Sequence, residues 1–521
     1  MEDKDLSRRE EGRNDFMSRT KNSALNAAVS VVTHAISLVT GFISRSVFVR
    51  TLSAEYLGIN GLFFNILSML SLAELGIGAA IAYSLYRPIA LGDTRSVRIL
   101  MAFYRRAYLW IGAVVFLLGA AMTPFLNHLF KSVPDIPHLR LYFFLFLLNS
   151  TVSYLYAYKR SLIIAHQKEY IATAYYQFFY VLRQVAQIVL LLTTGRFLFY
   201  LLAQLVCTLL ENVLLSRRAD RMYPYLKEPC GERLDAETFG TIRKNTAAML
   251  FHKIGGVMVF GTDSILIAKL AGVVQVGLYS NYCMIIDALA TIFGRLFWAT
   301  TASVGNVGAT ERTERARSIF GAVDLAAFWV YGSVSLCLLV LVNPFITLWL
   351  GPKYLFPMGV VLPLALNFYL TGMRQSVHVF KNALGLFWQD RYKPLFEAAI
   401  NLAASIALFR VFGVAGVVLG TTVSTVTVCV WVEPYVLYRF GFGHSVREYF
   451  ARYATYGALL LAAGTAVRFV DGLIVGQGLG ILLLRALACV AVTNALFFAA
   501  LFRRKEFRFL LEHGRMLFHK G

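Results

Sequence analysis

The chain has 521 residues, of which 58% are hydrophobic and only 15% charged, and its mean hydropathy is +0.62. This composition excludes an ordinary water-soluble domain and indicates an integral membrane protein. In a soluble protein, the net charge of +21 would suggest nucleic acid as a partner. Cytoplasmic loops of membrane proteins collect Lys and Arg, however, and the sequence shows no aromatic and basic platform. We therefore expect no nucleic-acid partner.

Apolar runs long enough to cross a bilayer recur along the whole chain. A spanning helix needs about 20 such residues, and runs this apolar satisfy their backbone polar groups by forming helices. We therefore predict an all-α polytopic fold with about 14 transmembrane helices. Their expected ranges, numbered one to fourteen in chain order, are 24–45, 58–84, 107–128, 141–160, 171–193, 197–216, 246–268, 277–300, 321–342, 357–380, 394–411, 413–436, 452–469 and 479–501.

The basic residues predict how the chain crosses the membrane. The stretch from Met1 to Lys21 is charged and polar, which is typical of a cytoplasmic tail rather than a signal peptide. Further basic clusters lie in 87–106, in 217–244 and after residue 502. If the N-terminus is cytoplasmic and the spans alternate, most of the Lys and Arg residues fall on the cytoplasmic side, as membrane proteins prefer. Both termini are then cytoplasmic.

The two halves of the chain resemble each other. Three short matches, each about 220 residues apart, occur at equivalent places. They pair Lys21-Asn22-Ser23-Ala24 with Lys244-Asn245-Thr246-Ala247, Leu57-Gly58 with Val276-Gly277, and Gln167 and Tyr170 with Gln389 and Tyr392. A repeat of six spans keeps its orientation, so we predict two parallel six-helix lobes around a central cavity, plus two C-terminal helices. The predicted parts are a tail (1–23), an N-lobe (24–216), a loop (217–245), a C-lobe (246–438), the last two helices (439–503) and a C-terminal tail (504–521).

The tenth predicted span carries the clearest candidate site. Its polar residues follow one another at spacings of 4, 3, 4 and 3 and so share one face of a helix. They are Asn367, Thr371, Arg374, His378 and Lys381. Ionisable groups at membrane depth are costly and usually face a cavity or a partner. One reading is a cationic pathway for an anionic substrate. The other is that Arg374 and Lys381 pair with carboxylates or mark the cytoplasmic end of the helix.

Other spans add polar residues to this candidate site. Ser37 and Thr40 belong to a polar stripe on the first span, which either packs against a neighbouring helix or lines a cavity. Arg45 near the end of that span, and Lys253 in the seventh, are further candidate cations. Candidates for coupling to a proton or sodium gradient are Glu74, Asp263 and Asp287. We interpret Gly413, Gly416 and Gly420 as close-packing positions between helices.

The sequence shows no sign of an enzyme. It contains no GxxxxGK phosphate loop, no HExxH and no GxSxG motif, and the loops are too short for a soluble active-site domain. None of the six cysteines forms a CxxC pair, so we expect neither disulfides nor a bound metal. We expect no cofactor beyond a possible driving ion.

Three segments carry a resemblance to a known family. The segment 50–62 (RTLSAEYLGINGL) resembles the connection between the first two helices of Wzx-type oligosaccharide-lipid flippases, which belong to the multidrug/oligosaccharidyl-lipid/polysaccharide (MOP) exporter superfamily. The segments 72–78 (LAELGIG) and 83–88 (YSLYRP) look like their second helix and first inner loop. The segment 158–170 (YKRSLIIAHQKEY) is similar to their loop between helices four and five.

This resemblance implies transport of an undecaprenyl-diphosphate-linked oligosaccharide to the outer leaflet of the bacterial cytoplasmic membrane, for surface polysaccharide synthesis by alternating access. Membrane lipids, a polysaccharide polymerase and glycosyltransferases are the implied partners. A cavity bearing Arg374, His378, Lys381, Arg45 and Lys253 suits the anionic diphosphate. A lipid II flippase and a drug/cation antiporter of the same superfamily remain alternatives. A membrane glycan polymerase or ligase is less favoured, because the first outer loop offers only Glu55.

Overall fold

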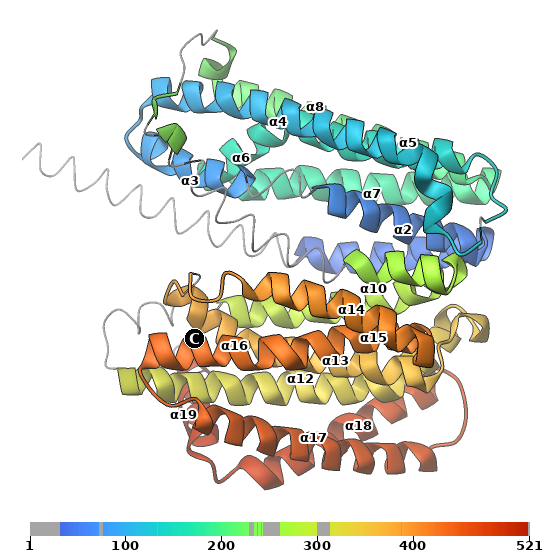
Figure 1. Ribbon diagram of the computed structural model, residues 1–521, viewed down its shortest axis with the longest axis vertical. Helices are drawn as coiled ribbons and strands as arrows, with labels where there is room; N and C mark the ends of the chain where they lie inside the picture. The colour runs from blue at the N-terminus through green and yellow to red at the C-terminus, as the bar shows by residue number, and fades with distance from the viewer. Residues whose placement is uncertain are drawn as a thin grey trace, which may run out of the picture. The chain divides into compact units, whose positions relative to one another are not determined.

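The computed structural model describes the backbone of residues 32–71, 77–132, 134–228, 234–236, 238–240, 242, 261–299, 313–386 and 388–518. Throughout these ranges the regular structure is helical and no strand occurs. The chain divides into two compact units, Met1–Val257 and Met258–Gly521, which are drawn from blue to green and from green to red in Figure 1. The predicted all-α polytopic membrane fold is therefore confirmed.

The first unit consists of helices that pack against neighbours in sequence and against more distant helices of the same unit. The helix Val32–Thr51 comes first in the described part. The helices that follow are α2 (Ala54–Leu70), α3 (Ile77–Ala90), α4 (Thr94–Met122), the 3-10 helix η2 (Thr123–Leu129), α5 (Leu139–Leu155), α6 (Ala157–Ala165), α7 (Glu169–Thr194), α8 (Phe197–Met222) and the 3-10 helix η3 (Pro224–Lys227). The pairs α4 with α5, α5 with α8, and α7 with α8 lie in contact.

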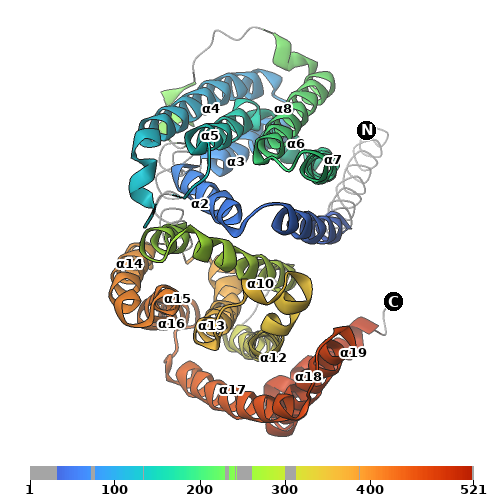
Figure 2. The ribbon, with the colours of Figure 1, turned by 90° about the vertical axis from the view of Figure 1, so that its right-hand side faces the viewer.

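The second unit begins its described part with a helical stretch at 261–270. The helices that follow are α10 (Val273–Ala299), α12 (Thr313–Trp349), the 3-10 helix η4 (Pro352–Tyr354), α13 (Met358–Ala383), α14 (Lys393–Phe412), α15 (Val414–Ser424), η5 (Thr425–Cys429), α16 (Val430–Val436), η6 (Leu437–Phe442), α17 (Arg447–Leu473), α18 (Leu479–Leu501) and α19 (Lys505–Phe518). In Figure 2, α12 and α13 lie between the α14–α15 pair and the α17–α18 pair.

In the described ranges, ten helices are long and apolar enough to cross a membrane, or eleven if a bent pair counts as one span. The bent pair is α5 with α6, which meet at 43° where the sequence predicts one continuous span over 141–160. Tyr156 joins the two helices with φ −123° and ψ 4°, outside helical values. The predicted seventh span lies mostly outside the described residues. α13 is absent from the ten because its polar stripe lowers its hydropathy.

The predicted twelfth span is also interrupted. The chain stays helical over Val414–Phe442, but two π-helical segments, η5 and η6, interrupt the α-helical hydrogen-bond pattern. Glu433 and Pro434 lie between these segments in α16. Pro434 has no amide hydrogen, and π-helical turns widen a helix locally and often accompany functional residues. α16, which carries Glu433, is in contact with α13.

The close-packing glycines divide into two kinds. A Cβ on Gly416 would lie 2.2 Å from the carbonyl oxygen of Leu408, and one on Gly420 would lie 2.0 Å from Oγ of Ser405. Both glycines therefore let α15 approach α14 closely, as predicted. The prediction is wrong for Gly413, where a Cβ would meet nothing within 4 Å. Gly413 has φ 58°, a left-handed value that suits glycine, and it forms the turn between α14 and α15.

Aromatic packing joins the last two spans to the rest of the second unit. The ring of Phe328 on α12 stacks on Tyr456 of α17 at 4.4 Å and lies 4.6 Å from the ring of Phe497 on α18. All three side chains are fully buried. Arg452 on α17 donates a hydrogen bond to the hydroxyl of Tyr438 at 2.8 Å. The α17–α18 pair is thus attached through α12 and η6 rather than through α14.

Candidate functional site

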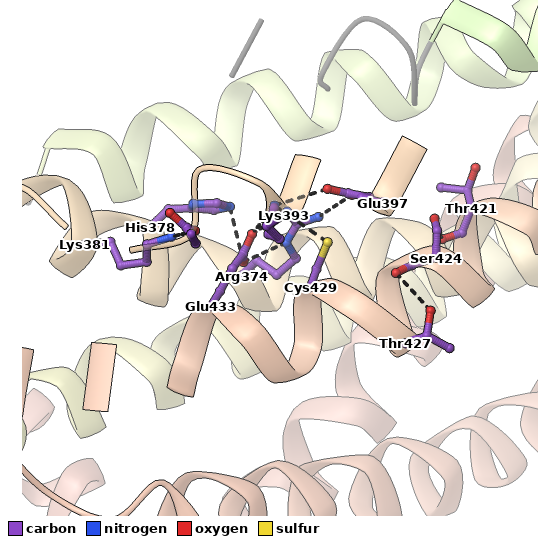
Figure 3. Close-up of polar contacts among 11 residues, drawn as sticks. Arg374, His378, Lys381, Lys393, Glu397, Thr421, Ser424, Thr427, Cys429 and Glu433 are labelled. Carbon is purple, nitrogen blue, oxygen red and sulfur yellow. Dashed lines mark hydrogen bonds and ion pairs between the residues drawn. The ribbon is translucent and has the colours of Figure 1, made fainter. Parts of the chain in front are cut away.

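The polar stripe predicted on the tenth span lies on α13, which is helical over all five positions. Asn367, Thr371, Arg374 and His378 are partly accessible, whereas most of the intervening side chains are buried. The stripe therefore marks the less covered face of α13. Figure 3 shows Arg374 and His378 on this helix, with Lys393 and Glu397 of α14 and Glu433 of α16 around them.

Arg374 lies at the centre of an ion cluster. Its Nη2 donates to Oε1 of Glu433 at 2.7 Å, and its Nε donates to Oε2 of the same carboxylate at 3.0 Å. This is the two-pronged geometry that a guanidinium offers to a carboxylate or a phosphate. The Nη1 atom of Arg374 lies 3.6 Å from Oε1 of Glu397.

Lys393 completes the cluster from the first turn of α14. Its Nζ lies 2.6 Å from Oε1 of Glu433 and 3.1 Å from Oε2 of Glu397, one helical turn further along α14. His378 adds a ring nitrogen 3.7 Å from Oε2 of Glu433. Two cations and two carboxylates thus compensate one another, which is what buried charges require. This is the carboxylate-paired reading that the sequence left open for Arg374.

The members of this cluster differ in how far they reach the surface. The side chain of Glu433 is 1% exposed, that of Arg374 12% and that of His378 33%. His378 therefore forms the most accessible edge of the cluster, whereas Glu397, Lys393 and Arg374 are exposed to similar extents, 8%, 9% and 12%. An anion that approached this edge would meet His378 first.

Two of the three remaining residues of the stripe, Lys381 and Asn367, have structural partners. Lys381 is buried in an ion pair with Asp390, in the connection between α13 and α14. The side-chain amide of Asn367 donates to the carbonyl of Val418 at 2.9 Å, and its oxygen accepts from Thr422 at 2.7 Å. Asn367 therefore joins α13 to α15. Thr371 lies between Asn367 and Arg374 on the partly accessible face.

Asp263 forms a second polar cluster in the same unit. It is buried, and its Oδ2 accepts hydrogen bonds from the hydroxyl of Tyr279 at 3.2 Å and from Oγ1 of Thr421 at 3.4 Å. Thr421 also accepts a hydrogen bond from Asn401 at 2.9 Å, and Thr262 lies 3.5 Å from the amide oxygen of Asn401. Among the described residues, no cation pairs with Asp263. The described partners of Asp263 are thus neutral hydroxyl groups, and a charge buried without a cation is costly.

The other predicted site residues do not join these clusters within the described structure. Ser37 and Thr40 lie in the first unit, where Ser37 donates to Gln177 of α7 at 2.9 Å and Thr40 to the carbonyl of Ile36 at 2.7 Å. Arg45 lies on the same helix, partly buried. Asp287 is exposed on α10. Glu74 and Lys253 lie outside the described residues.

Sequence reasoning missed the acidic half of the site. Glu397 and Glu433 fall inside the eleventh and twelfth predicted spans, and Lys393 directly precedes the eleventh. A carboxylate at membrane depth is as costly as a cation, so the same rule that singled out Arg374 identifies Glu397 and Glu433. Asn401, one turn after Glu397, carries the same kind of signal.

The fold is shared with known transporters. No protein-family model matches the chain, and no curated protein matches it. The lipid II flippase MurJ in an inward closed conformation superposes with a TM-score of 0.65 at 12% identity, over 91% of this chain and 99% of MurJ. An inward-facing multidrug resistance MATE family transporter of the MOP superfamily superposes with a TM-score of 0.59 at 14% identity. The match covers 79% of this chain and 98% of that transporter. A MOP superfamily transporter from Pyrococcus furiosus, described as having a binding pocket of reverse polarity, gives 0.52 at 16%, over 81% and 96%.

Proposed function

We propose that this protein is a flippase that moves an undecaprenyl-diphosphate-linked oligosaccharide from the inner to the outer leaflet of the bacterial cytoplasmic membrane, for surface polysaccharide synthesis. The observation that carries the proposal is the α13 cluster, in which the guanidinium of Arg374 holds Glu433 by two hydrogen bonds and His378 is the most accessible member. A diphosphate offers the same paired oxygens that Arg374 binds in Glu433. A cationic drug would instead favour a site with acidic groups at its accessible edge, because opposite charges attract.

The proposed binding step is an exchange of partners. The diphosphate takes the place of Glu433 on Arg374, and Glu433 keeps its contact with Lys393 at 2.6 Å. No carboxylate is then left buried without a cation, which avoids a cost of several kcal/mol. The polar oligosaccharide meets hydroxyl and amide groups of the stripe, and the isoprenoid tail stays in the lipid. Buried Asp263, with Thr421 and Asn401 nearby, is the proposed site of coupling to a proton or sodium gradient.

Comparison with the solved structures supports a lipid-carrier substrate over a drug. The match to the lipid II flippase covers 91% of this chain, whereas the match to a multidrug resistance MATE family transporter covers 79% and that to another MATE transporter 82%. The described α17 and α18 expose many large apolar side chains, which suits contact with lipid; they include Leu461, Phe469, Leu483 and Leu487. The same match makes lipid II the second candidate substrate.

Lipid analysis of the native host tests the proposal. Undecaprenyl-diphosphate species are extracted from cells with and without the protein and measured by mass spectrometry. Build-up of one complete oligosaccharide unit, with loss of the matching surface polymer, supports the oligosaccharide flippase. Build-up of lipid II with cell lysis assigns the second substrate instead. An unchanged pool of lipid-linked sugars contradicts both.

Variants of Arg374 test whether the α13 cluster is needed for export of the lipid-linked oligosaccharide. We expect Arg374→Ala to cause the same build-up as deletion, and Arg374→Lys to export partially, because lysine keeps the charge but loses the two-pronged geometry. Arg468→Ala is the matched control, since Arg468 lies on α17 with its side chain 52% exposed. Membrane levels of each variant are measured by immunoblot. Full export by Arg374→Ala at normal levels excludes the role given to this arginine.

A further inference from the structure

A second basic site lies in the first unit, far along the chain from α13. A cavity of about 760 Å³ opens between α4, the α5–α6 junction, the end of α8 and η3. Its volume falls within the range of small-molecule sites, roughly 300–1,000 Å³. All its lining residues belong to the first unit, so the site is complete without the second unit.

One face of α4 supplies most of the basic lining. Arg105 and Arg106 follow Arg98 by seven and eight positions, which is about two helical turns. All three therefore lie on the same side of the helix. The apolar residues Met101 and Leu109 occupy positions between and beyond them on that side. The cavity is thus lined by arginines and by apolar side chains of a single helix face.

The charges that line the cavity do not balance. Lys159 contacts Asp220 at 2.7 Å and Ser216 at 2.8 Å, so this cation is neutralised. Arg98 pairs in the same way with Glu228. Arg105 and Arg106 form no ion pair with any described residue, which leaves two positive charges on the cavity wall.

The expected level of the cavity in the bilayer indicates which kind of ligand it binds. Arg105 and Arg106 lie just before the third predicted span, 107–128, where the charge distribution predicts the cytoplasmic surface. Tyr156 and Tyr158 also line the cavity, and tyrosine favours the headgroup layer of a bilayer. Leu109, Leu155 and Leu226 form the apolar part of the wall. A ligand that satisfies all of these groups has a phosphate beside a short apolar segment.

We propose that this cavity binds the phosphate group of an anionic membrane phospholipid from the cytoplasmic leaflet, with Arg105 and Arg106 as its ligands. Guanidinium groups give two-pronged hydrogen bonds to phosphate oxygens. The apolar wall accepts the glycerol and the first methylenes of the acyl chains. The binding is independent of the flippase activity proposed above, because it involves neither α13 nor transport.

Native mass spectrometry of the purified full-length protein tests this site. The protein in detergent is titrated with dioleoyl phosphatidylglycerol, with dioleoyl phosphatidylcholine and with glycerol 3-phosphate. We expect tighter binding of the phosphatidylglycerol than of the phosphatidylcholine. Arg105→Gln/Arg106→Gln should weaken the first by at least fivefold. Competition by glycerol 3-phosphate at the affinity of the whole lipid assigns the site to a free phosphate compound with the same chemistry.

The matched control is Arg503→Gln/Arg504→Gln, another pair of adjacent arginines, which lies after α18 in the second unit and outside the cavity. Size-exclusion chromatography shows whether each variant is folded. If the pair variant misfolds, Arg106→Gln alone takes its place. It should weaken phosphatidylglycerol binding by about half as much as the pair variant, measured on a logarithmic scale of affinity. Equal losses in the cavity variant and the control, or no loss in either, overturn the proposal.

Discussion

Glu433 holds Arg374 by two hydrogen bonds, of 2.7 Å and 3.0 Å, across the interface between α16 and α13. The carboxylate reaches this position from between two π-helical segments, η5 and η6. Lys393 binds the same carboxylate from α14. One acidic side chain therefore connects three helices, and any ligand that takes Arg374 away from Glu433 also changes how these helices are held together.

The first prediction concerns the coupling of this pair. We expect Arg374→Ala and Glu433→Ala each to lower the free energy of unfolding by roughly 2–4 kcal/mol, because each leaves a buried charge with fewer partners. Each variant should therefore melt at a lower temperature in detergent. The double variant should lose less than the sum, with a coupling of at least about 1 kcal/mol. Circular dichroism melts of the four proteins measure this cycle. Strictly additive losses would show that the two side chains act independently.

Much of the fold follows from hydropathy alone. Long apolar runs predict helices, and the helices appear where those runs lie; α7, for example, spans Glu169–Thr194 against a prediction of 171–193. The interruptions were not predictable in the same way. The bend at Tyr156 and the π-helical segments around Glu433 depend on which helices pack nearby. The range 141–160 contains neither proline nor glycine, and 425–442 contains only Pro434 and Gly441.

The site was predictable only in part, because periodicity identifies a helix face but not its partners. The spacing of Asn367, Thr371, Arg374 and His378 places them correctly on one face of α13. Lys381 instead pairs with Asp390. This contact depends on the path of the chain after α13, which periodicity does not describe. The pairing of Arg374 with Glu433 joins residues 59 positions apart, a contact that only the tertiary packing determines.

The second prediction concerns close packing within the second unit. A Cβ on Gly372 of α13 would lie 2.0 Å from the ring of Tyr331 on α12, and Tyr331 is itself buried. We expect Gly372→Ala to destabilise the protein by roughly 1–3 kcal/mol, since a well-packed core does not accept an added methyl group without rearranging. Gly359→Ala on the same helix is the control, because nothing lies within 4 Å of its new Cβ. Equal melting temperatures for the two variants would contradict the packing.

The third prediction concerns the attachment of α17. The buried Arg452 donates to Tyr438 at 2.8 Å and lies within 4.0 Å of a carboxylate oxygen of Asp324 on α12. We expect Arg452→Ala to cost roughly 3 kcal/mol, because Asp324 then stays buried without a cation. Limited proteolysis should become faster between η6 and α17, whereas Arg468→Ala on the same helix leaves the cleavage rate unchanged. A resistant Arg452→Ala protein would show that aromatic packing alone holds α17.

The fourth prediction concerns Asp263 and the driving ion. If its carboxylate binds sodium, NaCl should raise the melting temperature of the detergent-solubilised protein more than KCl at equal ionic strength, because a ligand that binds only the folded state stabilises it. If it carries a proton, the melting temperature should instead depend on pH. In Asp263→Asn, which keeps the shape of the side chain and its contact with Thr421, the advantage of sodium should disappear and the pH dependence should become weaker.

Asp287→Asn is the control for this experiment, since Asp287 is exposed on α10 of the same unit and should leave the response to ions intact. Loss of the response in Asp287→Asn but not in Asp263→Asn would transfer the coupling role to α10. If the wild type and Asp263→Asn respond identically to sodium and to pH, Asp263 is a structural acceptor for Tyr279 and Thr421.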